Sequence, residues 1–180
     1  MRVIAGALKG RRLKAPGWEG VRPTSDKLRE TLFNILAARI DGARVLDGYA
    51  GTGAVGIEAL SRGAATVAFI EKDARAAALI QDNLTACGVE QGYTIQRGDA
   101  ASVLRRLPAG AAFDLIFLDP PYDDDTVTQA LEAAAALLAP DGLVVLERAT
   151  RREPEVPAAL TRVRDVRSGD STLTFMTRPR

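Results

Sequence analysis

Residues 44–56 decide the fold of this chain, and they read Arg-Val-Leu-Asp-Gly-Tyr-Ala-Gly-Thr-Gly-Ala-Val-Gly. A short apolar run is followed directly by glycines at positions 51, 53 and 56. This G-x-G-x-x-G spacing is typical of a nucleotide-binding turn between a strand and a helix, where glycines permit the tight turn and a close approach of the ligand. Glu71 ends the next apolar run, at the distance expected for an acid that binds ribose hydroxyls.

Apolar runs and helix-length segments alternate on either side of this turn. Alternation of this kind predicts a mainly parallel sheet with helices on both faces. The predicted strands are 44–47, 66–71, 93–96, 114–119 and 143–147, and the predicted helices are 53–61, 74–86, 100–107 and 126–138.

The two ends of the chain add further elements. Residues 2–6 and 11–15 flank a Lys9-Gly10 turn and are predicted to pair as a basic hairpin, followed by a helix from position 24 or 25 to 38. Residues 160–167 and 172–177 flank Ser168-Gly169-Asp170, which predicts a hairpin. That hairpin would give the sheet an antiparallel edge and bring it to seven strands.

Composition excludes several kinds of chemistry. The 180 residues include no histidine and one cysteine, which excludes Ser-His-Asp triads, imidazole metal sites and multi-cysteine zinc sites. We expect Cys87 to be inert, and a chain without an internal disulfide fits the cytoplasm. The consecutive acids at 123–125 fit the acidic start of a helix better than a metal site, so no metal is expected. No membrane segment is expected either.

The charges are segregated along the chain. The formal net charge is +1, but residues 1–30 carry eight basic and three acidic side chains, and residues 148–180 carry eight basic and four acidic ones. The middle is therefore acidic, at −8. Basic ends suggest contact with a polyanion and an acidic centre suggests a small cationic ligand, although ordinary solvated termini remain an alternative.

Asp47 bears on which nucleotide the glycine turn binds. A carboxylate at the end of the preceding strand would repel a pyrophosphate. S-adenosylmethionine carries a sulfonium, an ammonium and a ribose but no phosphate, so Asp47 favours that cofactor. Asp47 would serve the cationic methionine part, directly or through water, and Glu71 the ribose. The alternatives are that Asp47 caps the loop backbone and that Glu71 is a plain surface acid.

Asp99 follows the third predicted strand, at the same edge of the sheet. It could accept a hydrogen bond from the adenine amine. Taken alone, however, its position favours the N-cap of the helix that begins there.

The fourth predicted strand ends in Asp119-Pro120-Pro121-Tyr122. Two prolines fix the backbone and remove two N–H donors, which leaves a rigid loop rich in acceptors. Asp119 and the Pro120 carbonyl can each accept from an exocyclic amine while Tyr122 stacks on the ring. Such acceptors favour the geometry in which the nitrogen lone pair points at a methyl carbon, so alignment can replace a strong base. The alternative is a proline-rich turn with an incidental tyrosine.

These residues resemble class I S-adenosylmethionine-dependent methyltransferases that carry a (D/N/S)-P-P-(Y/F/W) motif. The blocks at 2–6, 10–13, 22–34 and 58–64, with 119–122 and 169–171, narrow the resemblance to the RsmD family. That family methylates the N2 amine of one guanine in bacterial 16S ribosomal RNA. The resemblance implies a Rossmann-like methyltransferase domain over 41–180 and an RNA-contacting extension over 1–40. Gly48 departs from the family, which usually has leucine there.

The resemblance also implies roles for individual residues. Those predicted for S-adenosylmethionine are Asp47, Tyr49, Ala50, Gly51, Thr52, Gly53, Glu71, Lys72, Asp99 and Ala100. Those predicted for the target base are Asp119, Pro120 and Tyr122. Those predicted for RNA, or for ordering the entrance of the site, are Arg11, Arg12, Lys14, Arg22, Thr24, Lys27 and Arg29. Trp18 could stack on a base or pack against the domain.

The expected partner is 16S rRNA, within an assembling or assembled 30S subunit, and the protein is expected to act as a monomer. Three other functions stay open. The same motif would serve methylation of adenine N6 or cytosine N4 in DNA, although the chain lacks an obvious DNA-recognition domain. A catalytically silent RNA-binding assembly factor would keep the fold. NAD binding is disfavoured by Asp47.

Overall fold

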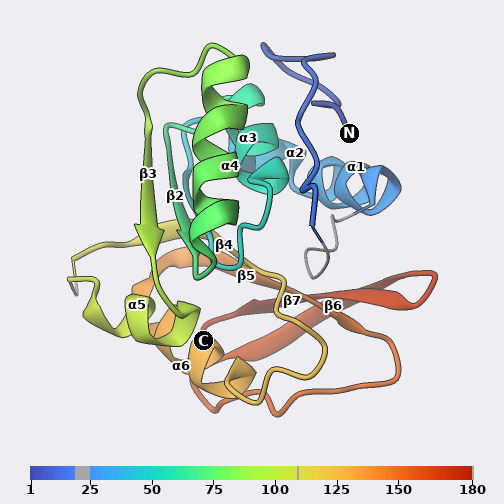
Figure 1. Cartoon of the computed structure of the whole chain (residues 1–180). Helices are drawn as coiled ribbons and strands as arrows, with labels where there is room; N and C mark the ends of the chain where they lie inside the picture. Colours follow the sequence, from blue (N-terminus) through green and yellow to red (C-terminus); the bar gives the residue numbers. More distant parts are fainter. Residues whose placement is uncertain (19–24, 109, 180) are drawn as a thin grey trace.

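The computed structural model describes residues 1–18, 25–108 and 110–179. Their strands form one seven-stranded sheet in the order β3-β2-β1-β4-β5-β7-β6 (Figure 1). The strands are β1 (Arg44–Asp47), β2 (Thr66–Glu71), β3 (Tyr93–Arg97), β4 (Phe113–Leu118), β5 (Leu138–Ala149), β6 (Thr161–Ser168) and β7 (Ser171–Thr177). The first five are parallel, and β7 pairs antiparallel with both β5 and β6. The predicted fold class and its antiparallel C-terminal edge are confirmed.

Helices cover both faces of the sheet (Figure 1). They are α1 (Asp26–Ile35), α2 (Ala37–Ile40), α3 (Ala54–Ser61), α4 (Ala74–Ala86), α5 (Ala100–Arg106) and α6 (Val127–Leu137). In one buried apolar cluster, the four helices α1, α2, α3 and α4 pack against one face of the sheet. In a second cluster, α5 and α6 pack against the other face. Because the central strands β1, β2 and β4 are covered on both sides, their sequences are short, mostly apolar runs, whereas no residue of the edge strand β3 is buried.

The strand order reverses beside β1, which lies between β2 and β4. Strand β1 leads into α3 and β4 leads toward α6. In open parallel sheets such a reversal separates the loops at the carboxyl ends of the strands and leaves a crevice between them. The glycine turn after β1 and the Asp119 loop after β4 border that crevice.

The N-terminal segment forms a shorter hairpin than predicted. An antiparallel bridge joins Arg2 and Arg12, the Val3 N–H donates to the Arg11 carbonyl at 3.0 Å, and the Leu13 N–H donates to the Met1 carbonyl at 3.0 Å. The backbone N–H groups of Ile4 and Ala5 donate to the buried carboxylate of Glu58 at 2.8 and 3.0 Å, so these donors are not available for a ladder. The pairing therefore stops at Val3, and the residues that follow are attached to α3.

Two other predicted elements differ from the observed ones by more than one residue. The predicted helix to position 38 is divided at Leu36 into α1 and α2, although Ser25 caps its start as expected, accepting from the Leu28 N–H at 3.2 Å. Strand β5 starts at Leu138, where the helix was predicted to end, because Leu138 already pairs with Phe113 of β4. Among the described residues, none of the helices combines the length and apolar character needed to span a bilayer.

Candidate active site at the carboxyl edge of the sheet

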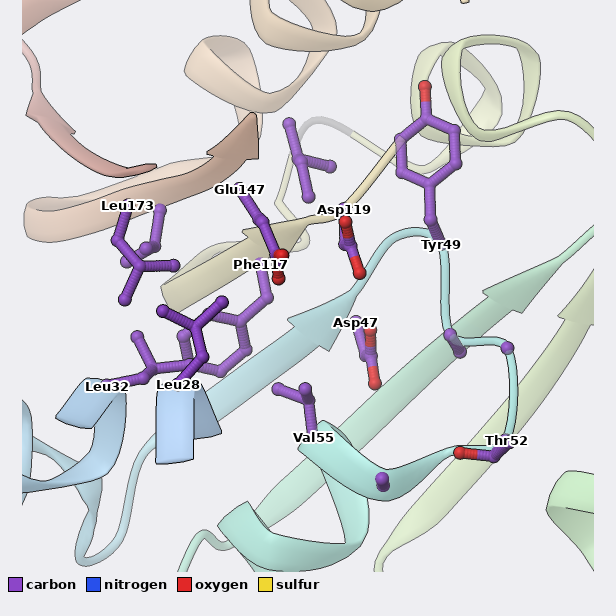
Figure 2. A pocket seen from close by; sticks show the side chains of 15 residues that line it. Leu28, Leu32, Asp47, Tyr49, Thr52, Val55, Phe117, Asp119, Glu147 and Leu173 are labelled. Atoms are coloured by element: carbon purple, nitrogen blue, oxygen red, sulfur yellow. The ribbon is translucent and has the colours of Figure 1, made fainter. Parts of the chain in front are cut away.

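A cleft of about 840 Å³ opens where the loops after β1, β2, β3 and β4 meet. This size is within the range of pockets that hold small organic ligands. Among the residues with predicted roles, Tyr49, Gly51, Glu71, Lys72, Asp99, Ala100, Asp119, Pro120 and Tyr122 line the cleft. Asp47, Ala50 and Thr52 line an adjoining cavity that also contains Asp119 (Figure 2). The structure thus brings together all of the predicted cofactor and target-base residues except Gly53, which lines neither cavity.

Two carboxylates hold the glycine turn. Gly51 and Gly53 have φ of +55° and +78°, a region that glycine adopts without steric cost. The Gly51 N–H donates to Glu71 Oε2 at 2.8 Å, and the Gly56 N–H donates to Asp47 Oδ2 at 3.0 Å. Asp47 does cap the loop backbone, which was the alternative to its cofactor role. The second oxygen of the same carboxylate leaves capacity for another partner.

Asp47 is an unusual acid because its side chain is almost entirely buried. Burial raises its pKa to about 7, the Gly56 N–H opposes this rise, and the negative charge of Glu71 adds to it. A cationic group bound nearby would favour the ionised form and lower this pKa again. The charge of Asp47 is therefore suited to a positively charged ligand.

Glu71 is held by backbone donors on both of its oxygens. In addition to Gly51, the Asp73 N–H donates to Oε1 at 2.8 Å. These bonds fix the carboxylate at the end of β2, and it still lines the cleft. An ionised carboxylate offers about four acceptor positions, so ribose hydroxyls can share it.

Asp99 caps helix α5, and its Oδ2 accepts from the Ser102 N–H at 3.0 Å. This confirms the capping interpretation favoured for it. A similar local interaction accounts for part of the acidic run at 123–125. Asp124 Oδ1 accepts from the backbone N–H of Thr126 at 2.7 Å, at the start of α6.

The Asp119 loop follows β4 directly, and the Asp119 side chain points into the cavity above Asp47 (Figure 2). Pro120 is buried, whereas the Tyr122 side chain is exposed at the mouth of the cleft. The Tyr122 hydroxyl lies 3.2 Å from Ser171 Oγ, and the Tyr122 carbonyl accepts from the Arg152 guanidinium. Contacts from β7 and from the segment after β5 thus hold Tyr122 in position.

Several cleft residues were not predicted. Glu147 of β5 lies beside Asp119, and Leu28 of α1 and Leu173 of β7 form an apolar wall (Figure 2). Glu147 could have been found, because it ends a predicted parallel strand as Asp47 and Glu71 do. Leu28 and Leu173 carry no comparable signal, since an apolar residue in a helix or strand is ordinarily core.

The residues predicted to contact RNA divide into two groups. Arg11, Arg12, Lys14 and Lys27 are exposed, whereas Arg22 and Thr24 lie outside the described residues. Arg29 is fully buried, and its guanidinium donates to Asp26 at 3.1 Å and to the Arg2 carbonyl. The prediction of an RNA contact is therefore wrong for Arg29, because an arginine without exposed surface cannot reach a phosphate. Its alternative role, ordering the entrance to the site, agrees with this position.

Trp18 lies half-buried at the edge of the cleft, with the Arg75 guanidinium 4.9 Å from its ring centre. One face of the indole is thus in contact with α4. This supports the packing alternative, and it leaves the ring at the boundary of the cleft.

The fold and the strand-end site define a class I methyltransferase. The structure is similar to the Escherichia coli protein yhhF, which is described as a methyltransferase, with a TM-score of 0.86 and 34% identity over 99% of this chain and 97% of that one. It is also similar to the Haemophilus influenzae methylase HI0767, with a TM-score of 0.81 and 29% identity over 98% and 97%.

The chain belongs to the family described as Conserved hypothetical protein 95, which matches residues 1–177. It is 38% identical over 151 residues to ribosomal RNA small subunit methyltransferase D of Haemophilus influenzae, covering 82% of this chain and 78% of that protein. It is 35% identical over 161 residues to the Escherichia coli protein of the same name, covering 88% and 80%. The resemblance to the RsmD family is confirmed.

Proposed function

We propose that this protein transfers a methyl group from S-adenosylmethionine to the N2 amine of a guanine in 16S ribosomal RNA. The observation that carries the proposal is the meeting of two loops in one cleft. The acceptor-rich Asp119-Pro120 loop of β4 opens beside the Asp47 glycine turn of β1. A cofactor in the turn and an amine at Asp119 would therefore be neighbours.

The chemistry of the cleft residues suits this cofactor. Asp47 and Glu71 present negative charge and hydrogen-bond acceptors, which match a cationic amino acid part and a ribose. Lys72, Asp99 and Ala100 line the same cleft on the β2 and β3 side. The bound cofactor would supply an electrophilic methyl group.

The Asp119 loop would prepare the amine for attack. Its carboxylate and the Pro120 carbonyl would each accept one N–H of the base, and Tyr122 would stack on the ring. Two acceptors hold the amine with its lone pair directed at the methyl carbon, and this alignment supplies much of the rate. Once the nitrogen has gained the methyl group it is cationic and acidic, so its proton can leave to an acceptor without a histidine.

Exposed cations at the N-terminus would hold the RNA. Arg11, Arg12, Lys14 and Lys27 are available for phosphate contacts, which orient an RNA without reading its sequence. We propose a monomer that acts in the cytoplasm on an assembling or assembled 30S subunit.

The test is methyl transfer from labelled cofactor to 30S subunits, naked rRNA and duplex DNA, followed by mass spectrometry of the nucleosides. The expected product is one N2-methylguanosine in 16S rRNA. Asp119→Ala should abolish it while RNA binding is retained, which separates catalysis from a silent binding role. Methylation confined to DNA, or an unchanged rate with Asp119→Ala, would contradict the proposal.

A further inference from the structure

Glu147 lies directly beside the acid of the Asp119 loop. The register of β4 and β5 pairs Leu118 with Leu146, so Asp119, the first residue after β4, follows beside Glu147 of β5. Adjacent strands lie about 4.8 Å apart. Both residues line the same two cavities, and Figure 2 shows their carboxylates side by side above Asp47.

The Glu147 carboxylate is held from the β7 side. Its Oε1 accepts from Ser171 Oγ at 3.1 Å, and the same Ser171 oxygen lies 3.2 Å from the Tyr122 hydroxyl. Because Glu147 and Tyr122 share Ser171, the carboxylate and the aromatic ring are fixed relative to each other. A base that stacks on Tyr122 would therefore meet Glu147 in a defined place.

Two adjacent carboxylates together present a row of acceptors, which suits a molecular edge that carries two neighbouring donors. Guanine offers such donors on one edge, because its N2 amine is next to the N1–H. Adenine and cytosine place a lone pair, at N1 or N3, next to the exocyclic amine. A carboxylate in that place would attract guanine and repel the other two bases.

We propose that Glu147 accepts the guanine N1–H while Asp119 accepts the N2 amine, and that Glu147 thereby selects guanine among the bases that carry an amine. This inference rests on the function proposed above. Leu28 and Leu173 are buried in the wall of the cavity, so the bonds would form in an apolar setting. Electrostatic interactions are stronger in such a setting than in water.

The test compares guanine with 2-aminopurine, a base that has a lone pair in place of the N1–H and keeps the N2 amine. After the methylated guanosine is mapped by mass spectrometry, 30S particles are assembled with guanosine or 2-aminopurine at that position. The wild type should prefer guanosine. Glu147→Gln should lower kcat/KM for guanosine by about 10- to 100-fold. It should also reduce the preference for guanosine over 2-aminopurine at least about tenfold, since the amide can donate to the N1 lone pair. Glu147→Ala, checked for folding by circular dichroism, should also reduce the preference for guanosine.

Ser171→Ala is the matched control. It removes the link to Tyr122 and keeps the Glu147 carboxylate, so it should lower the rates on both particles by a similar factor. If Glu147→Gln also lowers both rates equally, Glu147 only positions Tyr122 and the inference is overturned. If the wild type transfers no methyl group to guanosine N2, the proposed function itself fails. An intact guanosine activity with an unchanged preference in both Glu147 variants overturns the inference alone.

Discussion

The buried side chain of Asn83 ties Thr52 of the glycine turn to Lys14 of the N-terminal segment. Asn83 Nδ2 donates to the Thr52 carbonyl at 3.0 Å and to the Lys14 carbonyl at 3.2 Å, and Asn83 Oδ1 accepts from the Lys14 N–H at 2.8 Å. One amide on α4 thus links the turn proposed to bind the cofactor with the segment proposed to bind RNA.

Replacing Asn83 by aspartate should disturb both segments. The substitution keeps one acceptor for the Lys14 N–H but removes the amide donor and places a carboxylate beside two carbonyls. An unsatisfied buried group costs about 1–3 kcal/mol, more if charged, so the melting temperature should fall. Calorimetry should also show weaker binding of S-adenosylmethionine.

Asp82→Asn is the control for this change. Asp82 is exposed and pairs with Lys14 Nζ at 3.1 Å, so the control removes a contact to the same lysine from the same helix. An exposed pair contributes about 0–1 kcal/mol, and cofactor affinity should stay unchanged. Equal effects of the two substitutions on cofactor binding would contradict the role assigned to Asn83.

Asp47 should make the stability of the free protein depend on pH. Its pKa is about 7 in the folded protein, against the ordinary aspartate value of 3.8 that applies to the unfolded chain. The folded state therefore holds the proton more tightly than the unfolded state. The free energy of unfolding therefore falls as pH rises between these values, and the full cost is present above pH 7. Asp47→Asn, which can still accept from Gly56, should raise the melting temperature more at pH 8 than at pH 5.

The same carboxyl should make cofactor affinity depend on pH in the opposite sense. A cationic ligand binds the ionised form of Asp47 more tightly, so affinity for S-adenosylmethionine should increase from pH 6 to pH 8. Below the pKa of about 7, the increase approaches tenfold per pH unit. Titration calorimetry in buffers of different ionisation enthalpy should detect proton release. Asp47→Asn should bind more weakly and with a flatter pH profile, and an equally steep profile would assign the titration to another group.

Arg29 and Lys27 should separate stability from RNA binding, since they lie two positions apart on α1. Arg29 lies 3.9 Å from Glu58 Oε2, and both side chains are fully buried. Arg29→Met removes one partner of a buried pair and should cost about 3–5 kcal/mol in denaturant unfolding. Lys27→Met should leave stability within about 0.5 kcal/mol and weaken RNA binding, with a smaller salt dependence. A loss of stability in Lys27→Met, with none in Arg29→Met, would contradict these assignments.

The parallel sheet could be predicted because burial on both faces imposes a mostly apolar run on its central strands β1, β2 and β4. The predicted ranges 44–47 and 66–71 are the observed bounds of β1 and β2. The short length of the N-terminal hairpin could not be predicted in the same way. Beyond Val3, the backbone donors of Ile4 and Ala5 are taken by Glu58, more than 50 positions along the chain, and no local pattern reveals that contact.

The site was predictable to the extent that it follows strand ends. Asp47, Glu71 and Asp119 all line the cavities at that edge. The role predicted for Arg29 rests on its place in the N-terminal block that resembles the RsmD family, although its spacing from Leu32 and Phe33 places it on the buried stripe of α1. Helical periodicity could therefore have corrected that assignment, whereas the pairing of Arg29 with Glu58 depends on tertiary packing.

Gly48 should be coupled to Leu118, which lies on the neighbouring strand directly before Asp119. A Cβ added at Gly48 would lie 2.5 Å from Leu118 Cδ2 and 3.1 Å from the Phe117 carbonyl oxygen. Leu118 thus fills the space in which the family usually has a larger residue at position 48. Gly48→Ala should displace Leu118, with a cost of about 1–3 kcal/mol and a lower methyl-transfer rate, because Asp119 is attached to the displaced residue.

Leu118→Val shortens the side chain that the new methyl group meets, and on its own it should cost about 1 kcal/mol. In the double variant the two changes compensate in volume, so the loss of stability should be smaller than the sum of the two single losses. Denaturant unfolding of the four proteins in this cycle measures that coupling directly. Additive losses would show that Gly48→Ala is accommodated without moving Leu118, and its effect on Asp119 would then be absent as well.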